Sequence, residues 1–272
     1  SRTYCELTEL KTGKVLLTNL RDGMRWMPKS NKLYYTVVAP EGNDVITLDP
    51  VTLKEEVLLR GIPEQGFSWS PNEDFLIYYP REEGVKDEGP LKRIVSPADR
   101  IPNTRGRSFL ARYDIASGTS ERLTYGNHST YMQDISPDGK YLAFTLQEYG
   151  GFGVWHKDAE LYMIRLSDGK TYPLSEANSA EGESYHSWSH NNRWLVFSSR
   201  RLDGLYTRPF FTYIDDKGTA HKPFLLPQKN PVKYYKDLLW TYNLPEFIQE
   251  KAQVDTHAVM ETMRNTKGIQ VK

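Results

Sequence analysis

Four ten-residue windows of the sequence superimpose without gaps. They are residues 26–35 (WMPKSNKLYY), 69–78 (WSPNEDFLIY), 135–144 (ISPDGKYLAF) and 188–197 (WSHNNRWLVF), and their starts lie 43, 66 and 53 residues apart. Each window has an apolar residue, a stretch of turn-forming residues and then alternating apolar and aromatic positions. This pattern is typical of two strands joined by a tight turn. Each window is therefore predicted to be a β-hairpin, and the repetition restricts the fold more than any local feature.

A second strand-turn-strand pattern follows each window. It covers residues 45–58, 110–123, 161–174 and 211–224. Two hairpins per unit make a four-stranded antiparallel sheet, and a repeat near 43 residues lies within the range of propeller blades. The sequence thus predicts an all-β fold, a β-propeller of four-stranded antiparallel blades.

Residues 4–17 match only the second half of a unit. The predicted propeller spans residues 1–230, with a half blade at about 4–20 and full blades at 24–62, 65–126, 131–178 and 184–230. This count gives five outer hairpins and four inner ones, which leaves sheet edges unpaired in a ring made of one chain. We expect the chain to be the C-terminal part of a propeller of six or seven blades. Closure of the ring by a second chain is the alternative.

The remaining residues, 231–272, follow a different pattern. Residues 232–240 have apolar side chains at helix-like spacing, and residues 247–263 are rich in good helix formers. The sequence predicts a short helical C-terminal extension.

The charge balance excludes several functional classes. The chain has 35 Lys and Arg residues against 35 Asp and Glu residues, whereas proteins that bind duplex nucleic acid through its phosphates usually carry a basic excess. No apolar run approaches the roughly 18 residues of a membrane span. Cys5 is the only cysteine, so intramolecular disulfides and cysteine-cluster zinc sites are also excluded. We expect no nucleic-acid partner and no membrane span.

The windows at 135–144 and 69–78, together with the strand ending Glu121-Arg122-Leu123-Thr124, resemble the TolB-type, WD40-like (PD40) propeller repeat of the bacterial envelope. The resemblance covers roughly residues 4–230, and residues 198–208 are similar to the last blade of TolB-like proteins from Bacteroidetes. Two windows depart from the Ser-Pro-Asp pattern, with Met27-Pro28-Lys29 in the first and Ser189-His190-Asn191 in the fourth.

The resemblance implies a non-catalytic interaction module without a cofactor. Its partner would be another envelope protein or a cell-wall component, and its location the periplasm or the outer membrane. No GxSxG nucleophile motif, P-loop or GxGxxG fingerprint is present. The propeller-plus-hydrolase peptidases that share this repeat style are therefore matched only in their propeller half.

Two long insertions, residues 79–107 and 148–158, fall between the second and third strands of their blades. Long loops on a rigid scaffold commonly carry function, so we predict that this face binds the partner. The candidate binding residues on this face are His128, Tyr131, Tyr149, Trp155, His156, Tyr185, His186, Arg200, Arg201, Asp203 and Tyr206.

Two alternatives remain open at this face. His128 and His186 could converge on the channel mouth and hold a divalent metal with nearby carboxylates or Gln133, as in polysaccharide lyases built on a similar propeller. The interpretation that we favour is that they are exposed loop histidines, and we predict no metal site. Trp155, in a glycine-rich insertion, suits either a carbohydrate or protein contact or a loop anchor. The tryptophans at 26, 69 and 188 share one repeat position and are predicted to pack between blades.

Overall fold

The chain folds into consecutive antiparallel sheets. The computed structural model describes residues 5–9, 12–20, 23–62, 66–82, 107–126, 129–148 and 153–248, together with residues 255, 257, 260, 261 and 264. Within these residues, one two-stranded sheet is followed by four sheets of four strands each. The prediction of an all-β fold with four-stranded antiparallel blades is confirmed.

Each sheet is built from strands that are adjacent in the sequence. The first two sheets contain β1 (Cys5–Thr8), β2 (Val15–Leu20), β3 (Arg25–Trp26), β4 (Leu33–Ala39), β5 (Gly42–Leu48) and β6 (Glu55–Ile62). The third contains β7 (Phe67–Trp69), β8 (Phe75–Tyr78), β9 (Ala111–Asp114) and β10 (Thr119–Arg122). The fourth contains β11 (Ser129–Ile135), β12 (Tyr141–Gln147), β13 (Glu160–Arg165) and β14 (Lys170–Pro173). The fifth contains β15 (Glu183–Trp188), β16 (Trp194–Ser199), β17 (Arg208–Tyr213) and β18 (Phe224–Leu225).

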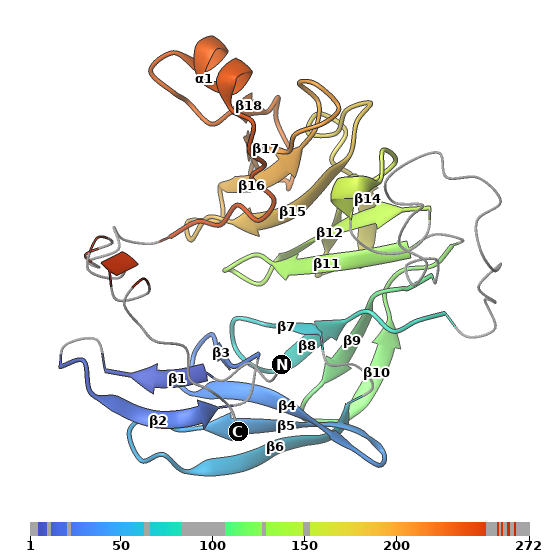
Figure 1. The fold of residues 1–272 in the computed structure, drawn as a ribbon. Coiled ribbons are helices and arrows are strands. Elements are labelled where there is room, and N and C mark those ends of the chain that lie inside the picture. Colours follow the sequence, from blue (N-terminus) through green and yellow to red (C-terminus); the bar gives the residue numbers. More distant parts are fainter. Residues whose placement is uncertain are drawn as a thin grey trace, which may run out of the picture.

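The sheets form an arc in space. In Figure 1 the arc runs from β1 and β2 through the sheets β3–β6, β7–β10 and β11–β14 to β15–β18. The first strand of each four-stranded sheet lies on the inner side of the arc, and the fourth lies on the outer side. The inner strands β3, β7, β11 and β15 therefore supply the residues that face the centre.

A serine closes the turn of three of the four repeated hairpins. The Ser136 hydroxyl accepts a hydrogen bond from the Tyr141 N–H at 3.0 Å, and the Ser189 hydroxyl accepts one from the Trp194 N–H at 2.9 Å. Ser70 plays the same role towards Phe75 at 3.1 Å. The missing proline after Ser189 therefore does not disturb this turn.

The first hairpin forms without this serine. Met27 takes the serine position, and its backbone N–H pairs with the Lys32 carbonyl at 2.8 Å. The hairpin between β3 and β4 is thus held by main-chain pairing and by the Glu73 carboxylate, which accepts hydrogen bonds from the Lys29 and Ser30 N–H groups at 2.6 Å. The departure at Met27-Pro28-Lys29 leaves the blade intact.

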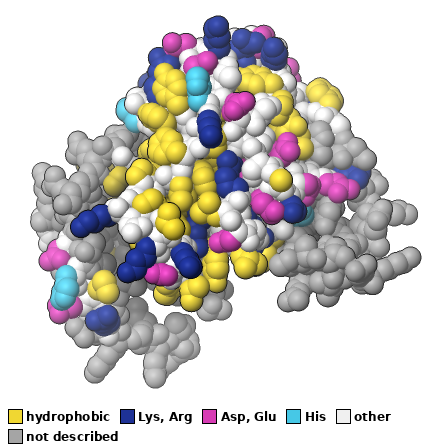
Figure 2. Space-filling model, turned by 90° about the horizontal axis from the view of Figure 1, so that it is seen from above, with side chains coloured by type: hydrophobic (Ala, Val, Ile, Leu, Met, Phe, Trp, Pro, Cys, Tyr) yellow, Lys and Arg dark blue, Asp and Glu magenta, His cyan; other side chains and the backbone are white. Residues whose placement is uncertain are grey.

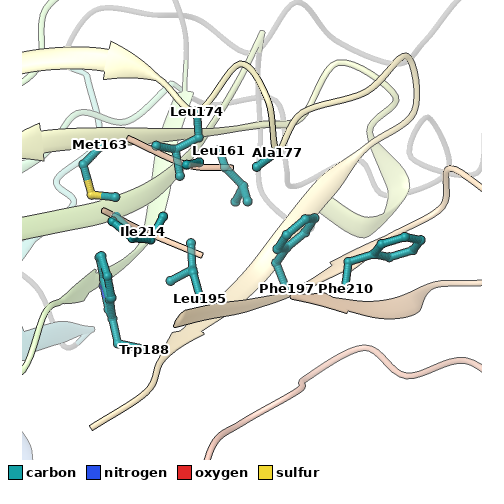
Figure 3. Close-up of a cluster of buried hydrophobic side chains, with 11 residues drawn as sticks. Leu161, Met163, Leu174, Ala177, Trp188, Leu195, Phe197, Phe210 and Ile214 are labelled. Atoms are coloured by element: carbon teal, nitrogen blue, oxygen red, sulfur yellow. The ribbon is translucent and has the colours of Figure 1, made fainter. Parts of the chain in front are cut away.

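Three apolar clusters fill the spaces between neighbouring four-stranded sheets. Trp69 packs in the cluster between the second and third sheets, Phe144 between the third and fourth, and Trp188 between the fourth and fifth. Figure 3 shows the last cluster, in which Leu161 and Met163 of β13 lie opposite Leu195 and Phe197 of β16. Face-to-face packing of successive sheets is how propeller blades are stabilised.

Trp26 is not buried like the tryptophans at the equivalent positions of the other repeats. Trp69 and Trp188 are 9% and 6% exposed, but Trp26 is 55% exposed, so the prediction that it packs between blades is wrong. Trp69 and Trp188 contact the four-stranded sheet that precedes their own. The sheet that precedes Trp26 has only β1 and β2 among the described residues, and this smaller partner leaves the indole uncovered.

The first helix after the last blade is shorter than the sequence predicts. Helix α1 (Pro231–Asp237) begins with Asn230, whose side chain accepts a hydrogen bond from the Lys233 N–H at 3.1 Å, and with Pro231 in the first turn. It ends three residues before Trp240, and residues 238–248 have no regular structure. The second predicted helix, at 247–263, lies mostly outside the described residues. No helix among the described residues is long and apolar enough to cross a membrane.

Candidate functional site

A cavity of about 370 Å³ lies on the inner side of the arc, and we call it the inner cavity. All four inner strands, or the residues beside them, contribute to its wall, as does the C-terminal segment. Its lining residues are Arg25, Gly66, Phe67, Ser68, Tyr79, Gln133, Asp134, Tyr185, His186, Ser187, Leu244, Pro245 and Glu246. Tyr79, the first residue of the 79–107 insertion, places this cavity beside the elaborated loops.

Four of the lining residues occupy one repeat position. Arg25, Ser68, Asp134 and Ser187 each directly precede a repeated window, and each belongs to a different blade. The first residue of each window is apolar, whereas the residue before it is a cation, a carboxyl or a hydroxyl. Side chains alternate between faces along a strand, so one position packs the blade and the next faces the cavity.

Two inner strands are irregular at equivalent places. The pairing of β11 with β12 shifts register between Tyr131 and Asp134, and the pairing of β15 with β16 shifts between Ser184 and Ser187. Tyr185 has a φ of +49°, a left-handed conformation that is uncommon for residues other than glycine. Bulges of this kind redirect side chains and are frequent next to functional sites.

The bulges bring Gln133 and His186 into the cavity wall. These residues are repeat equivalents, and both are 8% exposed. The Gln133 amide donates a hydrogen bond to the Ile77 carbonyl at 3.1 Å, while its Oε1 atom has no partner among the described residues. Neither ring nitrogen of His186 makes a well-formed hydrogen bond in this part of the chain. Burial lowers the His186 pKa to about 4, opposed in part by the Ala143 backbone, so the ring is neutral near pH 7.

Asp134 is the most perturbed acid in the cavity. Burial raises its pKa to about 7, although the Trp188 N–H donates a hydrogen bond to its carboxylate at 3.3 Å. The negative charge of Glu246 raises this pKa further. A carboxyl group with a pKa near 7 can change its protonation state at physiological pH, which is typical of binding and catalytic sites.

The predicted site residues divide into three groups. Tyr185 and His186 line the inner cavity. His128 and Tyr149 lie outside the described residues, and so does the side chain of Tyr131, whose backbone belongs to β11. The other six lie in the loops and turns of the last two blades, away from the cavity lining.

Trp155 and Arg200 contact each other on this surface. The Arg200 guanidinium lies 5.4 Å from the centre of the Trp155 ring, which is 37% exposed. His156, next in sequence, is buried, and its ring lies 3.6 Å from the Asp158 carboxylate. The 3-10 helix η3 (Gly153–Trp155) thus anchors the end of the second insertion and leaves one indole face available.

Three predicted binding residues serve the structure of the last blade. Arg201 pairs with the fully buried Glu183 at 3.1 Å and lies over the Phe210 ring. The Asp203 carboxylate accepts hydrogen bonds from two backbone N–H groups of its own turn, at Leu205 and Tyr206, both at 2.8 Å. Their assignment to binding stays a prediction.

The described ends of both insertions are fixed to the blades. Arg122 forms two hydrogen bonds of 2.9 Å with Glu82, at the start of the first insertion. The Asp158 carboxylate accepts a hydrogen bond from the Glu148 N–H at 2.7 Å, which closes the base of the second. The insertions therefore leave the blades from defined points, and the first does so next to the cavity.

A metal site is not assembled by the described residues. No group of three His, Cys, Asp or Glu side chains among them could hold a metal ion. The pairing of His128 with His186 is untested, because His128 lies outside this part of the chain.

The surface does not favour a partner of one charge sign. Figure 2 shows the face above the last blade, where Lys and Arg side chains are interspersed with Asp and Glu and with hydrophobic patches. This distribution agrees with the balanced composition.

No family model matches the sequence, and no curated protein matches it. Solved structures are similar in fold. An oligogalacturonate lyase in complex with manganese has a TM-score of 0.56 and 18% identity, covering 82% of this chain and 59% of its own. An oligogalacturonate lyase from Vibrio parahaemolyticus has a TM-score of 0.55 and 12% identity, with the same coverage of 82% and 59%. TolB from Acinetobacter baumannii has a TM-score of 0.46 and 16% identity, covering 82% and 51%.

These similarities concern the fold. Together with the arc of four-stranded sheets, they define the chain as a β-propeller protein. The chain spans between 51% and 59% of the length of the three proteins. Propellers host many unrelated activities, so function has to be argued from the inner cavity.

Proposed function

We propose that the chain is a non-catalytic, TolB-like interaction module of the bacterial envelope. It binds a protein or cell-wall partner at the mouth of the propeller, on the face of the 79–107 and 148–158 insertions. The observation that carries this proposal is the inner cavity, where one repeat position supplies a different polar side chain from each of four blades. Periplasmic or outer-membrane-associated localisation belongs to the same proposal and rests on the resemblance of the repeats.

The geometry suits recognition of a polar ligand. Buried polar atoms without partners, such as Gln133 Oε1, lose free energy until a ligand or water satisfies them. Tyr79 and Tyr185 add aromatic surface with a hydroxyl at its edge, a combination that is frequent in binding sites. The cavity thus offers hydrogen-bonding groups, charges of both signs and aromatic rings in a rigid frame.

The proposal is tested by cross-linking affinity capture from native cell envelopes. The bait variants are the wild-type chain, a chain with both insertions shortened, and Ser187→Tyr, which adds bulk to the cavity wall. Ser117→Tyr is the matched control, since Ser117 is exposed on an outer turn. We expect a reproducible partner that is lost with the first two changes and retained with the control. The proposal is contradicted if no partner is captured, or if the captured partner still binds both the chain with shortened insertions and Ser187→Tyr.

The metal-dependent, carbohydrate-active alternative has its own test. It requires His128 to join His186 at the cavity. Metal analysis of the purified chain would then show stoichiometric manganese or calcium that is lost in His186→Ala. Metal-free protein would end this alternative.

A further inference from the structure

The C-terminal residues 238–248, which we call the strap, cross the last blade and end at the inner cavity. In Figure 1 the chain leaves α1 and runs back along the sheet β15–β18. Leu244, Pro245 and Glu246 then form part of the cavity wall. The wall of the cavity proposed above as the binding site is therefore partly built by the C-terminal segment of this chain.

The strap is held through its main chain. The Arg208 guanidinium donates hydrogen bonds to the carbonyls of Tyr235, Leu238 and Trp240, the one to Leu238 at 2.8 Å. The Ser198 hydroxyl lies 2.7 Å from the Tyr242 carbonyl oxygen. Contacts to backbone carbonyls do not depend on the side chains of the segment, so a peptide of another sequence can make them too.

Thr207 adds two more contacts. Its carbonyl accepts a hydrogen bond from the Tyr242 N–H at 3.1 Å, and its hydroxyl donates one to the Asn243 side chain at 2.6 Å. The blade surface under residues 238–243 of the strap is thus polar. Water can solvate such a surface once it is uncovered, unlike an apolar core.

Phe247 of the strap packs against the Phe211 ring of β17, but the other large apolar side chains of the strap bury little surface. Leu239, Trp240, Leu244 and Ile248 are 66–75% exposed. Free energy from apolar burial scales with the area removed from water, so the strap gains little from this source. Segments with few buried apolar contacts are the ones that open locally at low cost.

The end of the strap is poorly matched to the cavity by charge. Glu246 brings a carboxylate towards Asp134, the acid of β11, and like charges in a partly buried site repel. Arg25 is the cation of the described lining, yet no ion pair within the described residues joins it to either carboxylate. The phenols of Tyr79 and Tyr185 and the neutral ring of His186 complete the titratable groups of the wall.

We propose that the strap is an internal, displaceable ligand of the inner cavity. The external ligand that fits is an extended peptide segment that follows the same path and carries a basic residue where the strap carries Glu246. Its backbone would take the hydrogen bonds of Arg208 and Ser198, and its ammonium group would pair with Asp134. This inference rests on the proposed function, since it names the partner chemistry and the regulation of the same site.

The two unpartnered groups of the wall support a ligand at this place. Gln133 Oε1 can accept a hydrogen bond from an ammonium group, and so can the neutral imidazole of His186. Both residues are more than nine-tenths buried and lie in the wall beside Asp134. A cation would thus find a carboxylate and two acceptors, whereas the carboxylate of Glu246 could use only the single N–H of the imidazole.

The test uses fluorescently labelled peptides of residues 238–248 (LLWTYNLPEFI), in the native form and with Glu246→Lys. They are titrated at pH 8 into the full chain carrying Tyr242→Pro, which removes the N–H that binds Thr207 and loosens the strap. Thr241→Pro is the matched control, because it keeps that N–H. We expect the lysine peptide to bind the loosened chain about tenfold more tightly than the native peptide, which corresponds to one well-placed charge pair.

Two further measurements separate the outcomes. In the loosened chain with Asp134→Asn the preference for lysine should vanish. In the wild-type chain, saturating lysine peptide should speed hydrogen exchange at the Tyr242 amide, a readout that does not depend on any variant folding. No binding by either peptide with unchanged exchange, or equal affinities with Asp134 intact, overturns the inference. Because these assays use purified protein, they can fail while envelope capture still succeeds.

Discussion

The blade interfaces and the wall of the inner cavity use neighbouring positions of one repeat, but they obey different constraints. At the first residue of three windows the chain has Trp69, Ile135 and Trp188, all buried and apolar. One residue earlier stand Ser68, Asp134 and Ser187, which differ in charge and size. Packing between sheets requires one kind of side chain, whereas the cavity accepts several.

The backbone shows the same contrast. The strands β12 and β13 pair without a register shift over their whole length, but the inner strands β11 and β15 each contain a bulge. Regular pairing builds the blade, and local irregularity turns side chains towards the centre. Tyr185, in the bulge of β15, has a left-handed backbone conformation where the cavity forms.

The largest effect should come from the blade interface. Phe197 is fully buried between the fourth and fifth sheets, so Phe197→Ala leaves a cavity that the packed neighbours cannot fill. We expect the free energy of unfolding to fall by about 3–5 kcal/mol, measured by urea denaturation. Ser187→Ala, in the cavity wall, is the comparison and should cost less than about 1 kcal/mol. Equal losses in the two variants would remove the distinction between the regions.

The second effect concerns the buried ion pair of the last blade. Glu183 is fully buried and accepts hydrogen bonds from the Ser179 hydroxyl at 2.6 Å and the Ser199 hydroxyl at 2.8 Å, besides its pairing with Arg201. Arg201→Met leaves this carboxylate without its cation, which should cost about 3 kcal/mol at pH 7.

The pH dependence of this loss has a defined sign. Burial already raises the pKa of Glu183, and Arg201 opposes that shift. Without the arginine the folded-state pKa rises further, so stability is lost as pH increases from the ordinary pKa of a glutamate through the raised value. Unfolding measured at pH 4 and pH 7 should show the larger difference between variant and wild type at pH 7. A pH-independent loss would mean that Arg201 acts through its packing on Phe197 and Phe210 and its hydrogen bond to the Ala177 carbonyl, and not through the charge of Glu183.

Asp134 supplies the third prediction, this time from the cavity wall. Its pKa of about 7 lies above the ordinary value of 3.8, so the folded state is destabilised as pH rises from about 4 to 7 and stays so above. Asp134→Asn removes this penalty. We expect the variant to gain about 2 kcal/mol over wild type at pH 8, since partial exposure reduces the full effect of the shift, and to gain nothing at pH 4.

The measurement is thermal or urea unfolding of both chains across this pH range. A variant that is less stable than wild type at pH 8 would show that the carboxylate serves the blade through its bond to the Trp188 N–H. In that case Asp134 would have to be counted with the residues that stabilise the blade interfaces, and not with those of the cavity wall.

The spacing of the repeated windows and their turn residues were sufficient to predict the four-stranded blades. Turn residues, strand alternation and unit length are local properties, and they fix the four-stranded sheets before any contact is known. The position of Ser136 in its window even marks the residue that closes the turn. Trp26 was mispredicted because burial depends on the neighbouring sheet, which its own window does not describe.

The site was only partly predictable. Tyr185 and His186 were found because they precede a window at a loop-bearing face. The same alignment extended to the residue before every window would also have selected Arg25, Ser68 and Asp134. No sequence pattern around Glu246 indicates that this residue lines the cavity. Its position there depends on hydrogen bonds that Arg208 and Ser198, both distant in sequence, make to the strap.

The smallest predicted effect concerns Trp26, which differs in burial from the tryptophans at the equivalent repeat positions. Trp26 is exposed beside a two-stranded sheet, while Trp188 occupies the equivalent position between two complete blades. Trp26→Ala should therefore change the free energy of unfolding by less than about 0.5 kcal/mol, against about 3–5 kcal/mol for Trp188→Ala. Urea denaturation of the two variants gives the comparison directly. A large loss at Trp26 would mean that this indole is covered in solution, as it would be if a second chain closed the ring at the edge beside β1 and β2, the alternative to a propeller of six or seven blades.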